Sequence, residues 1–341
     1  MMRRRTFLQG LAPGALAALS ACGGGQGQSG PFRLLITSTI VPVAPISVIE
    51  LAHNLGFYRR AGAPVELVRV QATPTAIAAL RSGQGEMANV SFDTALQVVA
   101  RGQIDLKAVV SPDKALPYVI IARDDINSVQ QLEGKTFGIG MVGSVDYLQT
   151  RAVLSRLGVN SDELSYLALG QPNVRTQALA AGRIGATTAT LGAWTAIPDK
   201  TGLHILVDPH RFHEAAPFIS KVNVVSANTI ATRRDEVEAV VRATIEASRA
   251  FAADHDLWVD AMHQARPDVS RAEIAQLATV YQDNWSVDGG LPAEDVQATT
   301  DALYDTPEFE GLRRVEPSEW VDNSFIDETL RQLAPTEGAQ L

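Results

Sequence analysis

The residues whose types and spacing could do chemistry lie near the middle of the chain. Thr136 to Ile139 is typical of a short buried strand, and Gly143-Ser144 of a turn and N-cap that open a helix over 145–157. The N–H groups at such a helix start have no partner within the helix, and the helix dipole makes the position electropositive. We therefore expect Gly143 and Ser144 to contact a small ligand.

The same stretch contains a nucleotide-binding pattern, which the context argues against. Gly138-x-Gly140-x-x-Gly143 matches the dinucleotide fingerprint, but its first two glycines lie within or at the end of the predicted strand instead of after it. The acids Asp162 and Glu163 precede the next predicted strand, whereas a ribose-binding acid should end it. We expect no nucleotide cofactor here, and no other cofactor.

A second group of reactive side chains suggests a metal site or a catalytic site at first sight. His210 and His213 are three positions apart, and Asp208 and Glu214 flank them. No further cluster of ligands supports a metal, so a loop with two solvated histidines is the better interpretation. The chain contains serine, histidine and aspartate but neither a nucleophile elbow nor a paired-carboxylate motif, which favours binding over catalysis.

The first 30 residues have the pattern of an export signal. Arg4-Arg5-Thr6-Phe7-Leu8 resembles a twin-arginine signal, and the apolar run after it is too short to span a membrane, which takes about 20 residues. Leu19-Ser20-Ala21-Cys22 resembles a bacterial lipobox and contains the chain's one cysteine. We expect a signal peptide over 1–21, lipidation at Cys22 and a flexible tether over 22–31; the twin-arginine and general export routes both remain open.

Charge and cysteine content argue against nucleic-acid binding and against a disulfide-stabilised fold. Removal of residues 1–21 takes away three arginines and no acid, so the formal charge changes from −9 to −12. An acidic body without a basic run is a poor nucleic-acid binder. A single cysteine cannot form a disulfide within the chain, so the hydrophobic core alone must stabilise the exported fold.

Alternating strands and helices must position the candidate residues. Strands are predicted at 32–37, 65–70, 87–90 and 106–110, with helices between them, which indicates an α/β fold with mainly parallel sheets. Ligands of such sheets bind at the carboxyl ends of the strands. The candidate ligand-binding residues at those ends are Ser38, Thr39, Gln71, Ser91, Phe92 and Asp93.

A unit made of a helix end, a glycine and a short strand occurs twice in the sequence. Residues 79–91 can be laid over residues 178–190 at an offset of 99 positions, with the helix end, the glycine stop, the short strand and the hydroxyl at the strand tip all coinciding. We therefore expect two similar lobes whose strand tips line one cleft. The second lobe would contribute Gly143, Ser144, Tyr147, Thr190 and Trp194.

Two strands without a preceding helix, 118–122 and 220–226, are interpreted as the crossings between lobes. This interpretation assigns 32–122 and 220–341 to lobe I and 123–219 to lobe II. The chain after 235 is predicted to be helical and to pack on lobe I, with the tryptophans Trp258, Trp285 and Trp320 in that packing.

Several of these segments together resemble the substrate-binding proteins of ABC transporters, in particular the subgroup that binds alkanesulfonates, taurine, nitrate or the pyrimidine precursor of thiamine. The resemblance rests on the lipobox, on the stretch 52–67, on Ala79-Leu80-x-x-Gly83, on Leu132 to Gly138 and on the helix start at Gly143-Ser144. It implies a type II periplasmic binding protein that closes on a ligand and delivers it to a membrane permease. Ser91-Phe92-Asp93 stands where many relatives have small residues, so the ligand itself is not implied.

The resulting expectation is a monomeric, lipid-anchored extracytoplasmic protein with a small-molecule ligand and a permease partner, without metal or enzymatic activity. The expected ligand is a small organic acid, a sulfonate or an aromatic carboxylate, and a pyrimidine-like heterocycle is the alternative. If Asp93 faces the cleft, a cationic or amino-bearing ligand is favoured instead. An enzyme on the same two-lobe frame and a purely structural lipoprotein are the competing classes.

Overall fold

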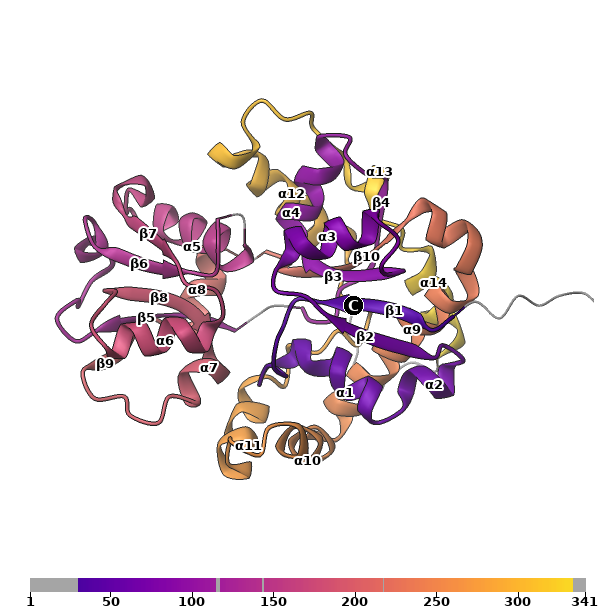
Figure 1. The fold of residues 1–341 in the computed structure, drawn as a ribbon, viewed down its shortest axis with the longest axis horizontal. Helices are drawn as coiled ribbons and strands as arrows, with labels where there is room; N and C mark the ends of the chain where they lie inside the picture. The colour runs from indigo at the N-terminus through magenta and orange to yellow at the C-terminus, as the bar shows by residue number, and fades with distance from the viewer. Residues whose placement is uncertain (1–29, 115–116, 143, 217, 334–341) are drawn as a thin grey trace, which may run out of the picture. The chain divides into compact units, whose positions relative to one another are not determined.

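The computed structural model describes residues 30–114, 117–142, 144–216 and 218–333. They form two five-stranded mixed sheets with helices around them (Figure 1). We call the first sheet with its helices the first lobe and the second sheet with its helices the second lobe. The expected signal peptide and Cys22 lie outside the described residues.

The first sheet has the strand order β2-β1-β3-β10-β4. β1 pairs in parallel with β2 and β3, whereas β10 runs antiparallel to β3 and β4. Parallel neighbours require crossover connections, and helices supply them. The strands are β1 (Phe32–Ile36), β2 (Val65–Arg69), β3 (Met87–Ser91), β4 (Leu106–Val110) and β10 (Lys221–Ser226), and the helices are α1 (Val48–Asn54), α2 (Phe57–Ala61), α3 (Thr73–Arg81) and α4 (Phe92–Ala100).

The second sheet has the order β7-β6-β8-β5-β9, which repeats the order of the first sheet strand for strand (Figure 1). Its strands are β5 (Tyr118–Arg123), β6 (Thr136–Ile139), β7 (Ser165–Ala168), β8 (Ala186–Thr190) and β9 (Leu203–Val207), and its helices are α5 (Val145–Arg156), α6 (Pro172–Ala180), α7 (Leu191–Thr195) and α8 (Pro209–Ala215). α3 and β3 have the same lengths as α6 and β8 and lie 99 positions before them. The expected internal repeat is therefore confirmed.

One expected boundary needs correction. β5 pairs with β8 and β9 and so belongs to the second sheet, which means that residues 118–122 are part of the second lobe and not of the first. The physical reason is symmetry: each sheet takes one antiparallel strand between two others, β10 in the first and β5 in the second. The crossings between the lobes therefore precede both of these strands.

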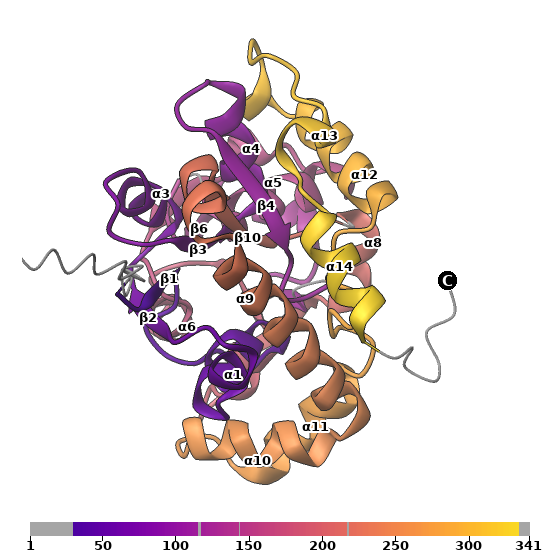
Figure 2. The ribbon, with the colours of Figure 1, turned by 90° about the vertical axis from the view of Figure 1, so that its right-hand side faces the viewer.

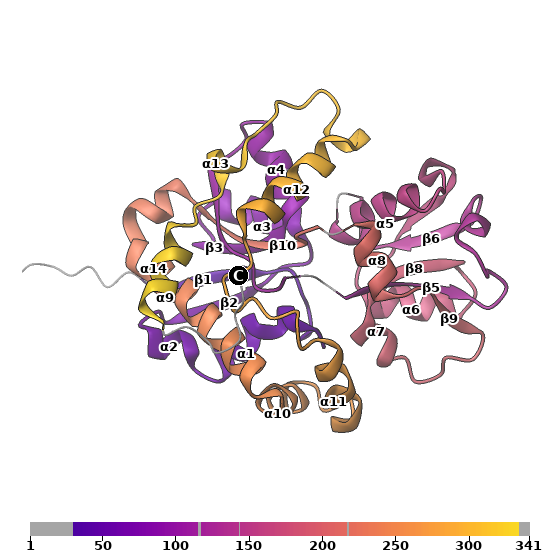
Figure 3. The ribbon, with the colours of Figure 1, turned by 180° about the vertical axis from the view of Figure 1, so that it is seen from behind.

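The C-terminal helices pack on the first lobe, as expected. α9 contacts α1, α2, β4 and α14, and Figures 2 and 3 show α9 and α14 side by side. Trp258, Trp285 and Trp320 are buried in this packing, with Trp258 5.7 Å from Trp285 between ring centroids. The helices are α9 (Ala227–Ala253), α10 (His255–Ala265), α11 (Arg271–Val280), α12 (Ala293–Tyr304), α13 (Pro317–Trp320) and α14 (Ser324–Gln332).

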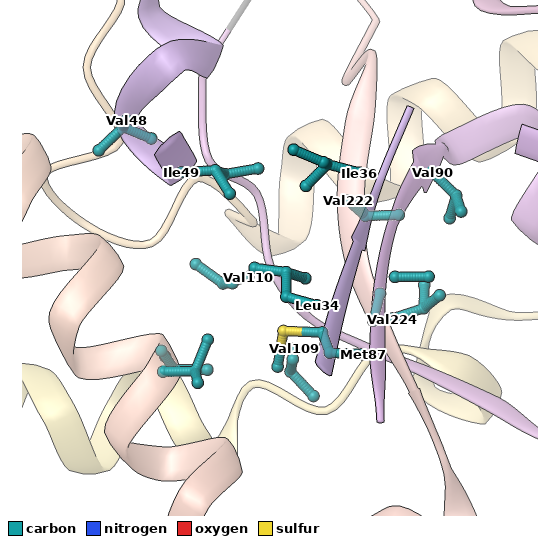
Figure 4. Close-up of a cluster of buried hydrophobic side chains, with 14 of the residues drawn as sticks. Leu34, Ile36, Val48, Ile49, Met87, Val90, Val109, Val110, Val222 and Val224 are labelled. Carbon is teal, nitrogen blue, oxygen red and sulfur yellow. The ribbon is translucent and has the colours of Figure 1, made fainter. Parts of the chain in front are cut away.

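The core of the first lobe explains why its strands read as continuous apolar runs. Side chains from β1, β3, β4 and β10 meet those of α1 in one buried cluster (Figure 4). Strands covered on both faces need apolar residues on both faces. Each buried valine or leucine contributes about 1.5–3 kcal/mol relative to an exposed one, so this cluster fixes the strand ends that carry the polar residues.

Candidate functional site

The loop before α5 is held by Asp146. Its Oδ2 accepts the N–H of Gly140 at 2.7 Å, and its Oδ1 accepts the hydroxyl of Ser144 at 2.6 Å. A Cβ at position 140 would lie 2.9 Å from Asp146 Oδ1, so a glycine lets the backbone approach the carboxylate. The Ser144 hydroxyl therefore helps to shape the helix start, and Gly143 lies outside the described residues.

A buried arginine completes this arrangement in the second lobe. Arg175 is 3% exposed, and its Nη2 lies 3.4 Å from Asp146 Oδ2. Its guanidinium also donates to Thr187 Oγ1 at 3.1 Å, to the Thr188 carbonyl at 3.0 Å and to the Gly170 carbonyl. Arg175 thus ties α6 to β8 and balances the charge of Asp146.

Lys221 lies at the start of β10, where the chain has just returned from the second lobe. It pairs with Ser91 across the sheet, and its Nζ donates to Thr37 Oγ1 at 2.6 Å. Burial lowers the pKa of Lys221 to about 8, although the carboxylates of Asp113, Asp93 and Asp146 each raise it. The ammonium of Lys221 is therefore close to acids of both lobes.

Asp93 lies in the first turn of α4 and is 5% exposed. Its carboxyl accepts hydrogen bonds from the Ser91 side chain and the Thr94 backbone, whereas Oδ2 has no partner among the described residues. Burial raises the pKa of Asp93 to about 6.

Asp113 lies on the connection that leaves β4 and is 1% exposed. Neither carboxylate oxygen has a hydrogen-bond partner in the described part of the chain, and burial raises the pKa of Asp113 to about 7. The Ser111 hydroxyl lies 2.7 Å from the Asp113 carbonyl and 2.8 Å from the Lys221 carbonyl, so it holds the two backbones together. We call Lys221, Thr37, Ser91, Asp93 and Asp113 the Lys221 cluster.

The two lobes contact each other at several places, one of them directly beside Lys221. Gln149 of α5 donates to Ser220 Oγ at 2.8 Å, just before β10, and Arg151 forms an ion pair with Glu308 at 2.7 Å. At the start of α7, a Cβ on Gly192 would lie 2.0 Å from the carbonyl oxygen of Val43, in the loop after β1. Only glycine permits this approach of α7 to the first lobe.

Comparison with known proteins identifies the family. A family model described as "NMT1/THI5 like" matches residues 46–256, more than half of the chain. The chain belongs to the NMT1/THI5-like family. No curated protein matches it.

Solved structures show that this member of the NMT1/THI5-like family has the periplasmic binding protein fold. The ligand binding component of an ABC-type import system from Staphylococcus aureus, with zinc bound, has a TM-score of 0.70 at 18% identity, covering 87% of this chain and 98% of that one. The periplasmic aliphatic sulphonate binding protein SsuA from Escherichia coli has a TM-score of 0.63 at 17% identity, covering 85% and 96%. The nitrate-binding protein NrtA from Synechocystis PCC 6803 has a TM-score of 0.69 at 11% identity, covering 90% and 89%.

The NMT1/THI5-like chain does not bring all the predicted site residues together. Ser91 and Asp93 lie in the Lys221 cluster, whereas Phe92 is 1% exposed and packs edge to face on Trp320 at 4.8 Å in the first-lobe core. Ser38 donates to Glu50 Oε1 at 3.0 Å, Thr39 is exposed, and the Gln71 carbonyl accepts from Gln171 of the second lobe at 3.4 Å.

The predicted second-lobe residues are partly buried and have neighbours of their own. Thr190 accepts the N–H of Ala193 as the N-cap of α7, and Trp194 carries the Lys200 ammonium 5.5 Å from its ring centroid. Tyr147 packs edge to face on Tyr166 at 5.1 Å. Their aromatic faces are thus partly occupied within the second lobe.

Sequence reasoning missed Lys221 and Asp113. A lysine at the start of an otherwise apolar strand and an aspartate directly after one are the available signals, and neither points to the other. Only the fold shows that they lie together.

Metal-ligand clusters and membrane-spanning helices are both absent from the described residues. Nowhere in them do three or more His, Cys, Asp or Glu side chains group as metal ligands, and His210 instead lies 3.5 Å from Glu214 on an exposed helix face. Nor does any helix described by the structure have the length and apolar character needed to cross a membrane.

Proposed function

We propose that this chain is the extracytoplasmic solute-binding component of an ABC importer, which captures a small organic molecule between its two lobes and delivers it to a permease. The observation that supports this proposal most is the Lys221 cluster, where charged and hydroxyl groups gather at the crossing between lobes. The fold and the named functions of the structural neighbours agree with this function.

Binding requires no covalent step in this proposal. The ligand meets polar groups of one lobe first, and closure brings those of the other lobe to it. Closure is stabilised only to the extent that the ligand binds the closed form better than the open form. Val43 and Gly192 supply a contact between lobes that such closure would form.

The ligand of first choice is a small organic acid, a sulfonate or an aromatic carboxylate, because Lys221 supplies a positive charge and two of the neighbours are named for sulphonate and nitrate. A pyrimidine-like heterocycle is the second candidate. The unpartnered oxygens of Asp93 and Asp113 favour it, since ring N–H and amino groups are hydrogen-bond donors.

A thermal-shift screen of the protein from residue 27 onward tests this function. The panel contains sulfonates, aromatic acids, nitrate and pyrimidines. A ligand at 100 times its dissociation constant should add about 2.7 kcal/mol of stability, or roughly 2 °C or more for a chain of this size. Lys221→Met should abolish the shift, whereas Lys135→Met, at an exposed position of the second lobe, should retain it. A ligand shift that survives Lys221→Met would contradict the site.

Lipid anchoring through Cys22 is part of the proposal. Full-length Cys22→Ser should move from the membrane fraction to the soluble fraction of cells, while Ser29→Ala, in the expected tether, should stay with the membrane. Retention of Cys22→Ser in the membrane fraction would argue for a different attachment. We also propose that the protein is a monomer, which light scattering of the purified protein checks.

The competing enzyme hypothesis makes a different prediction. An enzyme would convert a compound in a metabolite mixture, and changes at Asp93 or Asp113 would stop the conversion. We expect binding without turnover. Product formation by the purified protein that is lost in these variants would overturn the binding function.

A further inference from the structure

The Lys221 cluster contains more acceptor atoms than the protein uses. Asp113 is 1% exposed and neither of its carboxylate oxygens has a partner in the described structure; Asp93 is 5% exposed and its Oδ2 also has none. A buried polar atom without a hydrogen bond destabilises the folded protein, and a charged one does so more strongly. Natural proteins rarely retain three such atoms in one place without a use for them.

The Lys221 cluster contains two carboxyl groups and one ammonium, so it carries a net negative charge when both carboxyls are ionised. Lys221 is one ammonium facing Asp93 and Asp113, and one of its N–H groups is already given to Thr37. The nearby Asp146 is paired with Arg175 inside the second lobe, so this pair adds no net charge. The organic acid proposed above would be attracted by this ammonium, but the two carboxylates would repel it unless the same molecule also carries a positive group that pairs with them.

We infer that the ligand carries a cationic nitrogen group, such as a protonated amine or amidine, which donates hydrogen bonds to Asp113 and to Asp93 Oδ2. This inference rests on the proposed solute-binding function and specifies the chemical class of the solute. An acidic group on the same molecule would lie at Lys221, whose ammonium carries three N–H groups and donates one of them to Thr37. A charge-assisted hydrogen bond of this kind is about twice as strong as a neutral one.

The titration of Asp93 and Asp113 should make the affinity for the ligand depend on pH. Burial raises the pKa of Asp93 to about 6 and that of Asp113 to about 7, and the groups whose charges act with them are Lys221, Asp146, Arg175 and the Tyr118 phenol. A cationic ligand needs the ionised carboxylates. Its affinity should therefore rise as the pH is raised from 5 to 8, whereas an anionic ligand should bind more weakly over the same range.

Competitive retention from a defined mixture tests the inference. The ligand-free protein from residue 27 onward is equilibrated with equal amounts of amines, amidines, aminopyrimidines, sulfonates, carboxylates and isosteric neutral alcohols. Unbound compounds are removed, and the compounds released by denaturation are identified by mass spectrometry. We expect a compound with a cationic nitrogen to be retained at least about tenfold above its neutral isostere.

Matched variants make the result specific. Asp113→Asn and Asp93→Asn should reduce this retention about tenfold or more, while Asp235→Asn, at an exposed position on α9, should leave it unchanged. Melting curves show whether each variant is folded. If the retained compound lacks a cationic nitrogen, or if it is retained equally by the Asp113 and Asp93 variants, the inference is wrong but solute binding stands. If the wild-type protein retains none of the compounds, both proposals fail.

Discussion

Asp113 is the residue at which burial and charge conflict most clearly. Its carboxyl is 1% exposed, lacks hydrogen-bond partners in the described structure and interacts electrostatically with Lys221 and with the Tyr118 phenol. Because burial raises its folded pKa to about 7 from an unfolded value near 3.8, the protonated form is favoured by folding. The stability that this group contributes is present below pH 4 and is lost as the pH rises through 7.

Asp113→Asn should therefore stabilise the ligand-free protein at pH 8 and do so less at pH 5. The expected difference between the two pH values is about 1–3 kcal/mol, since the asparagine cannot ionise. Thermal melts of wild type and variant from pH 5 to pH 8 measure it, with Asp235→Asn as the exposed control. An equal effect of Asp113→Asn at both pH values would show that the carboxyl is not titrating in this range.

Arg175 illustrates the opposite case, a buried charge whose partners are all present. Arg175→Met removes the guanidinium from Asp146, from Thr187 and from two carbonyls, and it leaves Asp146 buried without its counter-charge. We expect a loss of about 3–5 kcal/mol in the free energy of unfolding. Denaturant titration checks this loss, and Arg183→Met, at an exposed position of the same lobe, should cost little. A loss below about 1 kcal/mol would mean that Arg175 is not structurally needed.

At the level of elements, the start of α7 decides how closely the second lobe approaches the loop after β1. A Cβ on Gly192 would meet the Val43 carbonyl oxygen at 2.0 Å and its carbon at 3.0 Å. The backbone of Gly192 does not have positive φ, so an alanine is compatible with the helix itself. The steric conflict is confined to the contact between lobes.

Gly192→Ala should consequently leave each lobe folded and weaken ligand binding. Overpacking of this kind costs about 1–3 kcal/mol, which corresponds to an increase of roughly fivefold to a hundredfold in the dissociation constant. Calorimetric titration with whichever ligand the screen identifies measures the affinity, and Gly30→Ala, where a Cβ would meet nothing, is the matched control. Unchanged affinity in Gly192→Ala would mean that this contact is absent from the bound form.

The strand ends carry the predicted site residues, and neighbouring side chains at one strand end point to different parts of the molecule. Ser91 and Asp93 follow β3 and lie in the Lys221 cluster, while Phe92 between them packs on Trp320. Adjacent residues at a strand end thus serve different regions. A sequence pattern places all three at the end of β3 but contains no information about which side each faces.

For the whole molecule, the proposed closure of the lobes would depend on the contacts between them, and one of these contacts is an ion pair. The Arg151–Glu308 ion pair joins α5 to a segment that packs with the C-terminal helices, and both side chains are largely buried. Because desolvation offsets much of the attraction in a partly buried ion pair, its net contribution is on the order of 1 kcal/mol. Such a small term is enough to shift an equilibrium between two forms of similar stability.

Glu308→Gln should increase the open population of the ligand-free protein. Small-angle scattering should record a larger radius of gyration than in the wild type, and the exposed neighbour Glu310→Gln should not change it. Addition of a saturating ligand should bring wild type and Glu308→Gln to the same compact value. A radius that is identical in the ligand-free proteins would show that other contacts hold the lobes.

The sequence alone determined the strands, the helices, the repeat at 99 positions and hence the α/β class, because these follow from local periodicity and turn residues. It also placed Ser91 and Asp93 at a strand end. Only the tertiary structure decided that β5 belongs to the second sheet and that Asp113 and Lys221 meet Asp93. The physical reason is distance along the chain: strand pairing and charge clustering join segments more than 60 positions apart, which no local pattern encodes.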